Sequence, residues 1–143
     1  LGIKRVAIAG GPSLAGMRAA VESASVELVP WTHEPGVGLL YESDAGLTDV
    51  QAAIAESGTL VCWSSASSGR GLSLVPPIHI ALVRRSDIVP DLIDYLARHS
   101  GPEVPASSIV FITGPSKTAD IEGILITGVH GPREVHIVLI EDA

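Results

Sequence analysis

Short apolar runs, separated by glycine, proline and small polar residues, divide the chain into segments with two alternating hydrophobic patterns. Short runs of mainly aliphatic residues, bounded by turn signals, are typical of buried strands. An Ala-rich stretch at residues 13–24 predicts a helix, and so do residues 87–99, where Val89, Leu92, Ile93 and Leu96 recur with helical spacing. The strands are expected at residues 4–9, 26–30, 59–63, 78–83, 109–113 and 134–140.

Two further helices are predicted from capping signals. Thr48 and Gln51 have the spacing of a capping box, with Gly58 placed as the C-terminal stop, so we expect a helix over residues 48–58. Ser116 follows a Gly-Pro pair and is a good N-cap, which predicts a short helix ending near Ile124. The segments expected to be loops are 31–45 and 64–71.

This order of elements predicts the fold class. Helices between strands imply crossover connections, and hence an α/β fold with a mainly parallel, open or doubly wound sheet flanked by helices. Only 3% of the residues are aromatic, so aliphatic side chains must build the core. We expect a single domain over residues 1–143, with ligands beyond the carboxyl ends of the strands.

Charge and cysteine content narrow the class of function. The net charge of −7 opposes binding to nucleic acid or anionic lipid, and no apolar run is long enough to span a membrane. A single cysteine, Cys62, excludes an intramolecular disulfide and a four-cysteine iron–sulfur cluster. With no signal peptide visible, we expect a cytoplasmic protein. Since the chain begins at Leu1, we also expect that N-terminal residues are missing.

The densest polar cluster lies at residues 113–122 and could hold an anion. A glycine allows close backbone approach, free N–H groups at a helix start attract anions, and a lysine adds charge. The spacing is not that of a Walker A loop. The alternative interpretation is a capped helix start with a solvated lysine. The candidate ligand-binding residues are Thr113, Gly114, Ser116, Lys117, Thr118 and Asp120.

A second cluster lies at residues 128–136. His130 could act as an acid or base near neutral pH, and Gly131 and Arg133 could hold a carboxylate. The alternative is a turn followed by an edge strand on which Glu134 and His136 point to the same side. These histidines have no cysteine pair beside them, so we expect no zinc site.

Three other residues are candidates by themselves, apart from these two clusters. Glu56, before Gly58, could be a covalent nucleophile, or it could be a surface glutamate beside a glycine cap. His79 alternates with isoleucines and is expected to be a satisfied, partly buried histidine. Cys62 lies in an apolar strand and is expected to be an inert core thiol.

Four of these segments, taken in order, resemble the lactate-utilization protein C (LutC) family, which carries a LUD domain. They are residues 55–61, 74–80, 112–122 and 128–136, and the last two are highly specific. The resemblance extends from about residue 46 to the C-terminus, whereas the first forty or so residues match poorly. Ser57 stands where the family pattern has threonine, which keeps the hydroxyl.

The resemblance implies a fold like that of NagB, RpiA and the CoA transferases. It also implies a role in a three-protein complex that oxidises L-lactate to pyruvate, in which the other two subunits resemble iron–sulfur redox proteins. We therefore expect a subunit without redox activity of its own, binding a small carboxylate and no cofactor, with the iron–sulfur clusters on its partners. The alternatives are a stand-alone enzyme like an acyl-CoA transferase or folate cyclo-ligase, with Glu56 as nucleophile, and a small-ligand-binding assembly factor.

Overall fold

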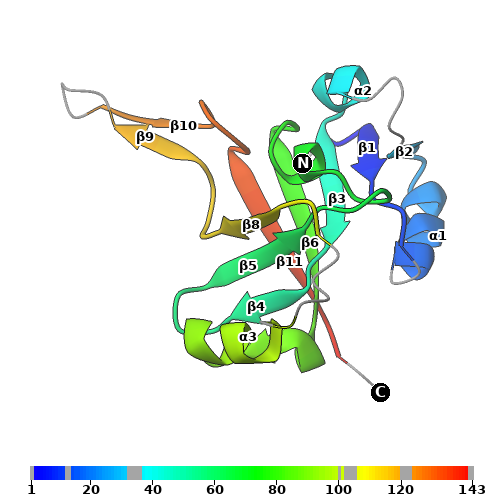
Figure 1. The fold of residues 1–143 in the computed structure, drawn as a ribbon. Helices are drawn as coiled ribbons and strands as arrows, with labels where there is room; N and C mark the ends of the chain where they lie inside the picture. Colours follow the sequence, from blue (N-terminus) through cyan, green and yellow to red (C-terminus); the bar gives the residue numbers. More distant parts are fainter. Residues whose placement is uncertain are drawn as a thin grey trace.

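A parallel five-stranded sheet, ordered β11-β6-β3-β1-β2, lies at the centre of the molecule (Figure 1). The computed structural model describes residues 2–11, 14–31, 37–99, 101, 106–119 and 124–141. Every hydrogen-bonded strand pair in this sheet is parallel, so the expected α/β fold with a mainly parallel sheet is confirmed. The strands are β1 (Arg5–Ile8), β2 (Glu27–Pro30), β3 (Ala45–Asp49), β6 (Ile78–Arg84) and β11 (Glu134–Ile140).

Two helices accompany the first three strands. Helix α1 (Ala15–Ser23) connects β1 to β2, as predicted, and α2 (Val37–Tyr41) precedes β3. The expectation of a loop over residues 31–45 is wrong at α2, because Leu40 is buried in the core and anchors this helical turn. The buried members of this core are Val6, Ala7, Ile8, Ala9, Leu14, Leu40, Ala45, Leu47, Leu72 and Leu82.

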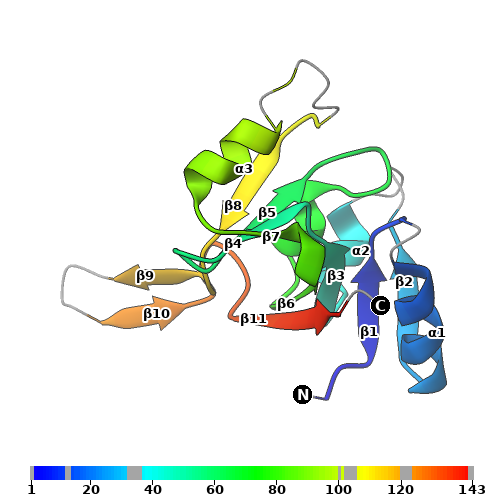
Figure 2. The same cartoon turned by 90° about the horizontal axis from the view of Figure 1, so that it is seen from below.

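A smaller sheet, ordered β7-β4-β5-β8, packs on the parallel sheet, and helix α3 (Leu92–His99) covers its outer side (Figure 2). Alternation along β5 explains the layering. Cys62 packs with Ala81 and Val83 of β6, whereas Val61 packs with Tyr95 of α3. The strands are β4 (Ala52–Ile54), β5 (Thr59–Trp63), β7 (Ile88–Val89) and β8 (Ile109–Ile112).

The helix predicted over residues 48–58 is wrong, because this segment contributes to both sheets. Strand β3 continues to Asp49, and β4 pairs antiparallel with β5. The two presumed capping residues are used across strands instead. The Thr48 hydroxyl bonds Nε2 of His79 at 2.9 Å, and the Gln51 side-chain oxygen accepts the backbone N–H of Trp63 at 2.6 Å. Tertiary pairing thus overrides the local capping pattern.

The helix predicted over residues 87–99 begins later, at Leu92, where the Asp91 carboxylate caps it by accepting the N–H of Asp94 at 2.8 Å. Strand β7 occupies part of the predicted helix and pairs with β4. The residues that recur with helical spacing are also not the ones that α3 buries. Tyr95 is buried against the smaller sheet, whereas Leu92, Ile93 and Leu96 are 47%, 78% and 50% exposed.

Strands β9 (Lys117–Ala119) and β10 (Leu125–Thr127) form an antiparallel hairpin that projects from the body in both views (Figures 1 and 2). The short helix predicted from Ser116 is therefore wrong in its described part, and residues 120–123 lie outside it. The Ser116 N–H donates to the carbonyl oxygen of Pro132 at 2.9 Å, so the segment is tied to the start of β11 instead of starting a helix.

Candidate functional site

The strand order creates a crevice between the carboxyl ends of β1 and β3. The chain leaves β1 toward β2 on one side and then returns to β3 on the other, which makes this pair the topological switch point of the sheet. Open α/β sheets bind ligands at such a point. A hollow of about 220 Å³ lies here, between Gly10-Gly11 after β1 and Asp49 at the end of β3. Its other walls are Gln51, Trp63, Ser64, Ser65, Ser67, Ser68 and Ala106.

A serine-rich loop after β5 closes this crevice on one side. The Gly10 N–H donates to the carbonyl oxygen of Ser67 at 2.7 Å, and a side chain at Gly10 would place its Cβ 3.2 Å from that of Ser67. Ser65 and Ser68 exchange backbone hydrogen bonds, which gives the loop a tight turn. The loop therefore holds several hydroxyl groups next to the glycine pair that ends β1.

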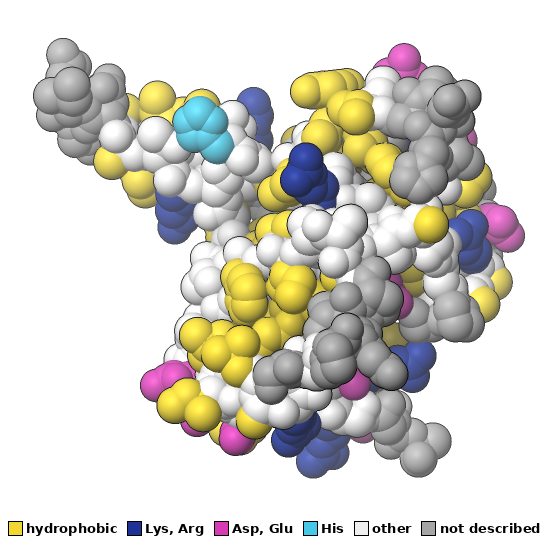
Figure 3. All heavy atoms as spheres, in the orientation of Figure 1, with side chains coloured by type: hydrophobic (Ala, Val, Ile, Leu, Met, Phe, Trp, Pro, Cys, Tyr) yellow, Lys and Arg dark blue, Asp and Glu magenta, His cyan; other side chains and the backbone are white. Residues whose placement is uncertain are grey.

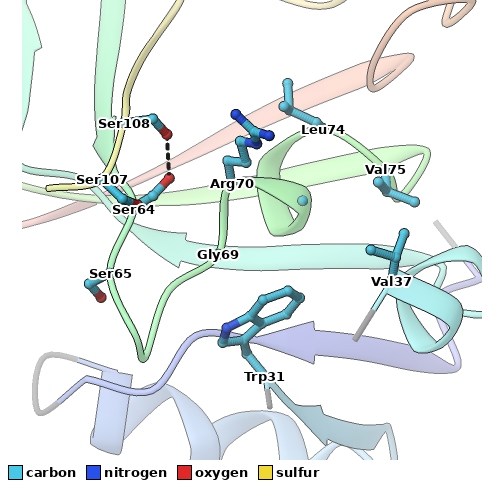
Figure 4. A pocket seen from close by; sticks show the side chains of 11 residues that line it. Trp31, Val37, Ser64, Ser65, Gly69, Arg70, Leu74, Val75, Ser107 and Ser108 are labelled. Carbon is cyan, nitrogen blue, oxygen red and sulfur yellow. Dashed lines mark hydrogen bonds between the residues drawn. The ribbon is translucent and has the colours of Figure 1, made fainter. Parts of the chain in front are cut away.

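A larger cavity of about 630 Å³ adjoins the crevice and shares Ser64 and Ser65 with it (Figure 4). Serine hydroxyls line one side, where Ser64 and Ser108 are 2.9 Å apart, oxygen to oxygen. The Trp31 ring forms the floor against Gly69, where a Cβ would lie 2.2 Å from the nearest indole carbon. The remaining lining residues are Val37, Arg70, Gly71, Leu74, Val75 and Ser107.

A third hollow of about 240 Å³ continues along the same edge of the sheet. It lies at the carboxyl ends of β3, β6 and β11 and shares Asp49 and Gln51 with the crevice. Arg84 and Asp87 contribute opposite charges to its wall. The three hollows thus adjoin one another in series, with Arg70 in the wall of the first and Arg84 in the wall of the last.

A buried polar cluster lies beneath these hollows, between the two sheets. The Thr48 hydroxyl bonds Nε2 of His79 and also the Cys62 thiol. Burial lowers the pKa of His79 to about 4 and raises the pKa of Cys62 to about 11, so both are uncharged at neutral pH. Cys62 is a core thiol, as predicted. His79 is fully buried and its Nδ1 has no hydrogen-bond partner, so the expected satisfied histidine is only half satisfied.

The two Gly-Pro corners singled out in the sequence adjoin one another. Besides the bond from Ser116 to Pro132, the N–H of Gly128 donates to the carbonyl oxygen of Ser116 at 2.9 Å. A Cβ at Gly131 would lie 3.3 Å from that of Ser116. The structure therefore brings together the segments that carry most of the candidate ligand-binding residues.

The side chains of these corners lie largely in solvent, at the base of the projecting hairpin. Lys117, His130 and Arg133 are exposed, as are Thr113 and Gly114, whereas Ser116, Thr118 and Gly131 are half-buried. Asp120 lies outside the described residues. None of these described residues lines the three hollows, so the corners and the crevice are separate candidate sites.

Glu56 occupies the exposed turn between β4 and β5, and its N–H donates to the carbonyl oxygen of Pro90 at 3.0 Å. A chain of hydroxyls connects this turn to the end of β8. Ser57 and Thr59 are 2.7 Å apart, and Thr59 and Thr113 are also 2.7 Å apart, measured between the side-chain oxygens. The turn of Glu56 is therefore next to Thr113, but Glu56 lines none of the three hollows.

The sequence interpretation missed Trp31, Asp49 and Gln51, and it assigned the serine loop only a surface role. Place in the sequence could have identified Trp31 and the Gly10-Gly11 pair as site residues, because both directly follow strands. Asp49 and Gln51 were missed because the helix expected over residues 48–58 placed the end of β3 inside a helix. Correct strand boundaries were needed before the rule about carboxyl ends could be applied.

Two classes of feature do not occur in the part of the chain that the structure describes. No three His, Cys, Asp or Glu side chains gather in a way that could hold a metal ion. No helix there is both long and apolar enough to cross a membrane.

Comparison with known proteins points to one family. Residues 39–140 match the family model described as LUD domain. The chain is 37% identical over 135 residues to a protein of Halalkalibacterium halodurans named lactate utilization protein C, covering 89% of this chain and 57% of that protein. It is 42% identical over 106 residues to the protein of the same name from Bacillus subtilis, covering 71% and 44%. The chain thus spans about half the length of these relatives.

A solved structure supports the fold alone. It is the crystal structure of a DUF162 family protein from Deinococcus radiodurans, which is 21% identical and superposes with a TM-score of 0.55. The match covers 99% of this chain and 89% of that chain.

Proposed function

The chain belongs to the LUD-domain family, and we propose that it serves lactate utilization as the non-iron–sulfur subunit of a system that oxidises L-lactate to pyruvate. In this proposal the chain binds the small carboxylate, and its partner subunits carry the electrons. The observation that carries the proposal is the crevice of about 220 Å³ at the switch point of the sheet. Its size suits a three-carbon acid better than the neighbouring cavity of about 630 Å³ does.

The groups around the crevice match the two functional groups of lactate. Hydroxyls of Ser65, Ser67 and Ser68 can donate hydrogen bonds to a carboxylate. Asp49, on the opposite side, can accept a hydrogen bond from the α-hydroxyl. Pyruvate lacks that hydrogen, so Asp49 favours the reduced acid over the oxidised one. We therefore assign carboxylate binding to the serine loop and discrimination between substrate and product to Asp49.

Electron transfer is assigned to the partners because this chain offers poor ligands for a cluster. Cys62 is its one cysteine, and the thiol is buried with a raised pKa. A thiolate is the form that binds iron, and cubane clusters are held by four cysteines. Oxidation of L-lactate to pyruvate releases two electrons and two protons; in this proposal, redox groups on the partner subunits would take the two electrons, and water would take the two protons.

The alternative of acyl transfer through Glu56 receives less support from the structure. Glu56 is exposed at a hairpin turn, with none of the three hollows beside it. Covalent catalysis by a carboxylate needs the acyl donor to be held against it. The Gly-Pro corners remain the second candidate for the carboxylate site, since their backbones adjoin and Arg133 and Lys117 supply positive charge.

Calorimetric titration of the chain with L-lactate and with pyruvate, with and without the partner subunits, tests the proposal. Asp49→Asn is expected to weaken L-lactate binding about tenfold or more and pyruvate binding less, since a good hydrogen bond to a charged group is worth about 1.5–3 kcal/mol. Ser67→Ala is expected to weaken both ligands.

Lys117→Met and Arg133→Met are the matched variants at the other candidate site. They are expected to leave binding within about threefold, because their side chains lie outside the crevice. If these two variants abolish binding while Asp49→Asn does not, the carboxylate site is at the Gly-Pro corners. If neither acid binds the chain under any of these conditions, the proposed function is wrong.

A further inference from the structure

We propose that two copies of this chain associate by pairing their β11 strands antiparallel, so that the two parallel sheets join into one. Strand β11 is at the edge of the sheet, and in the described part of the chain no strand pairs with its outer side. An open edge presents unpaired N–H and C=O groups and is a template for another strand. The seven residues of β11 make it a longer open edge than the four residues of β8.

The side chains of β11 are unusually apolar for an exposed strand. Ile137, Val138 and Leu139 are consecutive and are 56%, 36% and 52% exposed. Since successive side chains of a strand point to opposite faces, apolar side chains are exposed on both faces of the sheet. Strands of parallel sheets are normally buried on both faces. A large apolar area that reaches both faces of an edge strand is covered when the sheet continues past it.

A twofold axis normal to the sheet restricts the possible registers. Such an axis brings residues of the same face together, so the register must be centred on a residue of β11. The register of β11 on β6 shows which residues share a face: Val135, Ile137 and Leu139 lie on the side of His79, and His136 and Val138 lie on the other. Three registers set apolar residues in the middle of one β11 opposite apolar residues of the other. They are centred on His136, Ile137 and Val138.

Charges select the register centred on Ile137. Centring on His136 sets two imidazoles opposite each other, and centring on Val138 sets Glu141 opposite Val135. Centring on Ile137 sets Glu134 opposite Ile140, but among the three it is the register that sets Arg133 opposite Glu141 at both ends of the interface, and it also pairs Val135 with Leu139. Cross-strand pairs of opposite charge and of aliphatic side chains stabilise antiparallel sheets. Arg133 and Glu141 flank β11 and are both exposed, and the Arg133 side chain, which lies along Gly128, would have to turn toward the interface to meet Glu141.

A second apolar surface provides a matched control. On the face seen in Figure 3, hydrophobic side chains gather over α3 and β8, and Ile93 of α3 is 78% exposed. Helix α3 also carries charges of both signs, with Asp94 in its first turn and Arg98 in its last, so this surface could pair with itself as well. A dimer formed through α3 would depend on Ile93, whereas one formed through β11 would depend on Ile137.

Sedimentation equilibrium of the 143-residue chain over micromolar to sub-millimolar concentrations measures the association, with a dimer of twice 14.8 kDa expected. Ile137→Lys is expected to leave a monomer, and Ile93→Lys a dimer. Circular dichroism shows whether each variant is folded; both positions are largely exposed, so both are expected to fold.

Charge reversal tests the register itself. Arg133→Glu and Glu141→Arg are each expected to raise the dissociation constant about tenfold, because each change occurs twice in the symmetric interface. The double variant is expected to recover wild-type affinity within about threefold, since the opposite charges are restored. A chain that stays monomeric, a dimer abolished by Ile93→Lys, or single variants without rescue in the double variant would each overturn the proposal.

Discussion

The buried imidazole of His79 predicts that this protein loses stability as the pH falls below neutrality. His79 is fully buried between the two sheets, and burial lowers its pKa from 6.5 to about 4. Above pH 6.5 the imidazole is neutral in both the folded and the unfolded chain. Between pH 6.5 and 4 the unfolded chain binds a proton that the folded chain does not, so the free energy of unfolding falls with falling pH.

The size of the effect follows from the two pKa values. Their full difference corresponds to about 3 kcal/mol, reached near pH 4, and the part between pH 7.5 and 5 is about 2 kcal/mol. Since a typical domain is stable by only about 5–15 kcal/mol, a loss of this size is readily measured.

Urea denaturation at pH 7.5 and pH 5, followed by circular dichroism, measures the effect. Carboxylates also titrate as the pH falls, so the informative quantity is the difference between wild type and His79→Gln. Glutamine can still bond to the Thr48 hydroxyl but does not titrate. It is expected to lose about 2 kcal/mol less than wild type over this pH range, even though its stability at pH 7.5 is lower.

The matched control is His130→Gln, which removes an exposed imidazole and is expected to retain the wild-type pH dependence. If His79→Gln and wild type lose stability equally between pH 7.5 and 5, the imidazole is not held neutral by burial.

Two further predictions concern packing. A Cβ at Gly46 would lie 1.8 Å from the Leu72 carbonyl oxygen, so Gly46→Ala is expected to lower the free energy of unfolding by at least about 2 kcal/mol, measured by urea denaturation. Gly16 in α1 has open space around it, so Gly16→Ala is expected to raise the free energy of unfolding by about 0.5–1 kcal/mol. Equal effects of the two alanines would contradict this packing. Because its pKa is about 11, the Cys62 thiol is expected to react with a disulfide reagent at pH 8 only after denaturation, and rapid labelling of the folded chain would show that it is accessible.

Several elements could be predicted from the sequence because their signals are local. The strands at Ile78 and at Glu134 follow turns that contain proline, and each is a continuous run of mainly aliphatic residues. Helix α1 follows a glycine-rich turn, and its residues favour a helix wherever it packs. Such segments adopt the same structure in many tertiary contexts, which is why β11 was predicted to the residue.

The secondary-structure predictions that were wrong concern segments whose local sequence pattern is compatible with both a helix and a strand. The capping pair Thr48 and Gln51 suits a helix start, yet both side chains find partners on other strands. Ser116 suits an N-cap, yet its N–H bonds to Pro132 of a distant segment. The choice between helix and strand was decided by partners far along the chain, and no window around these residues contains that information.

The sequence by itself determined that this chain builds a parallel sheet from aliphatic strands, that one cysteine cannot hold a cubane cluster, and that two Gly-Pro corners interrupt its last third. Only the tertiary structure decided which strands are neighbours. The order β11-β6-β3-β1-β2 places the switch point beside Gly10 and Asp49, and leaves β11 at an open edge. Strand order depends on long-range backbone pairing, in which every strand has the same N–H and C=O groups to offer. The choice among neighbours is therefore made by packing of the whole chain, and both proposed surfaces follow from it.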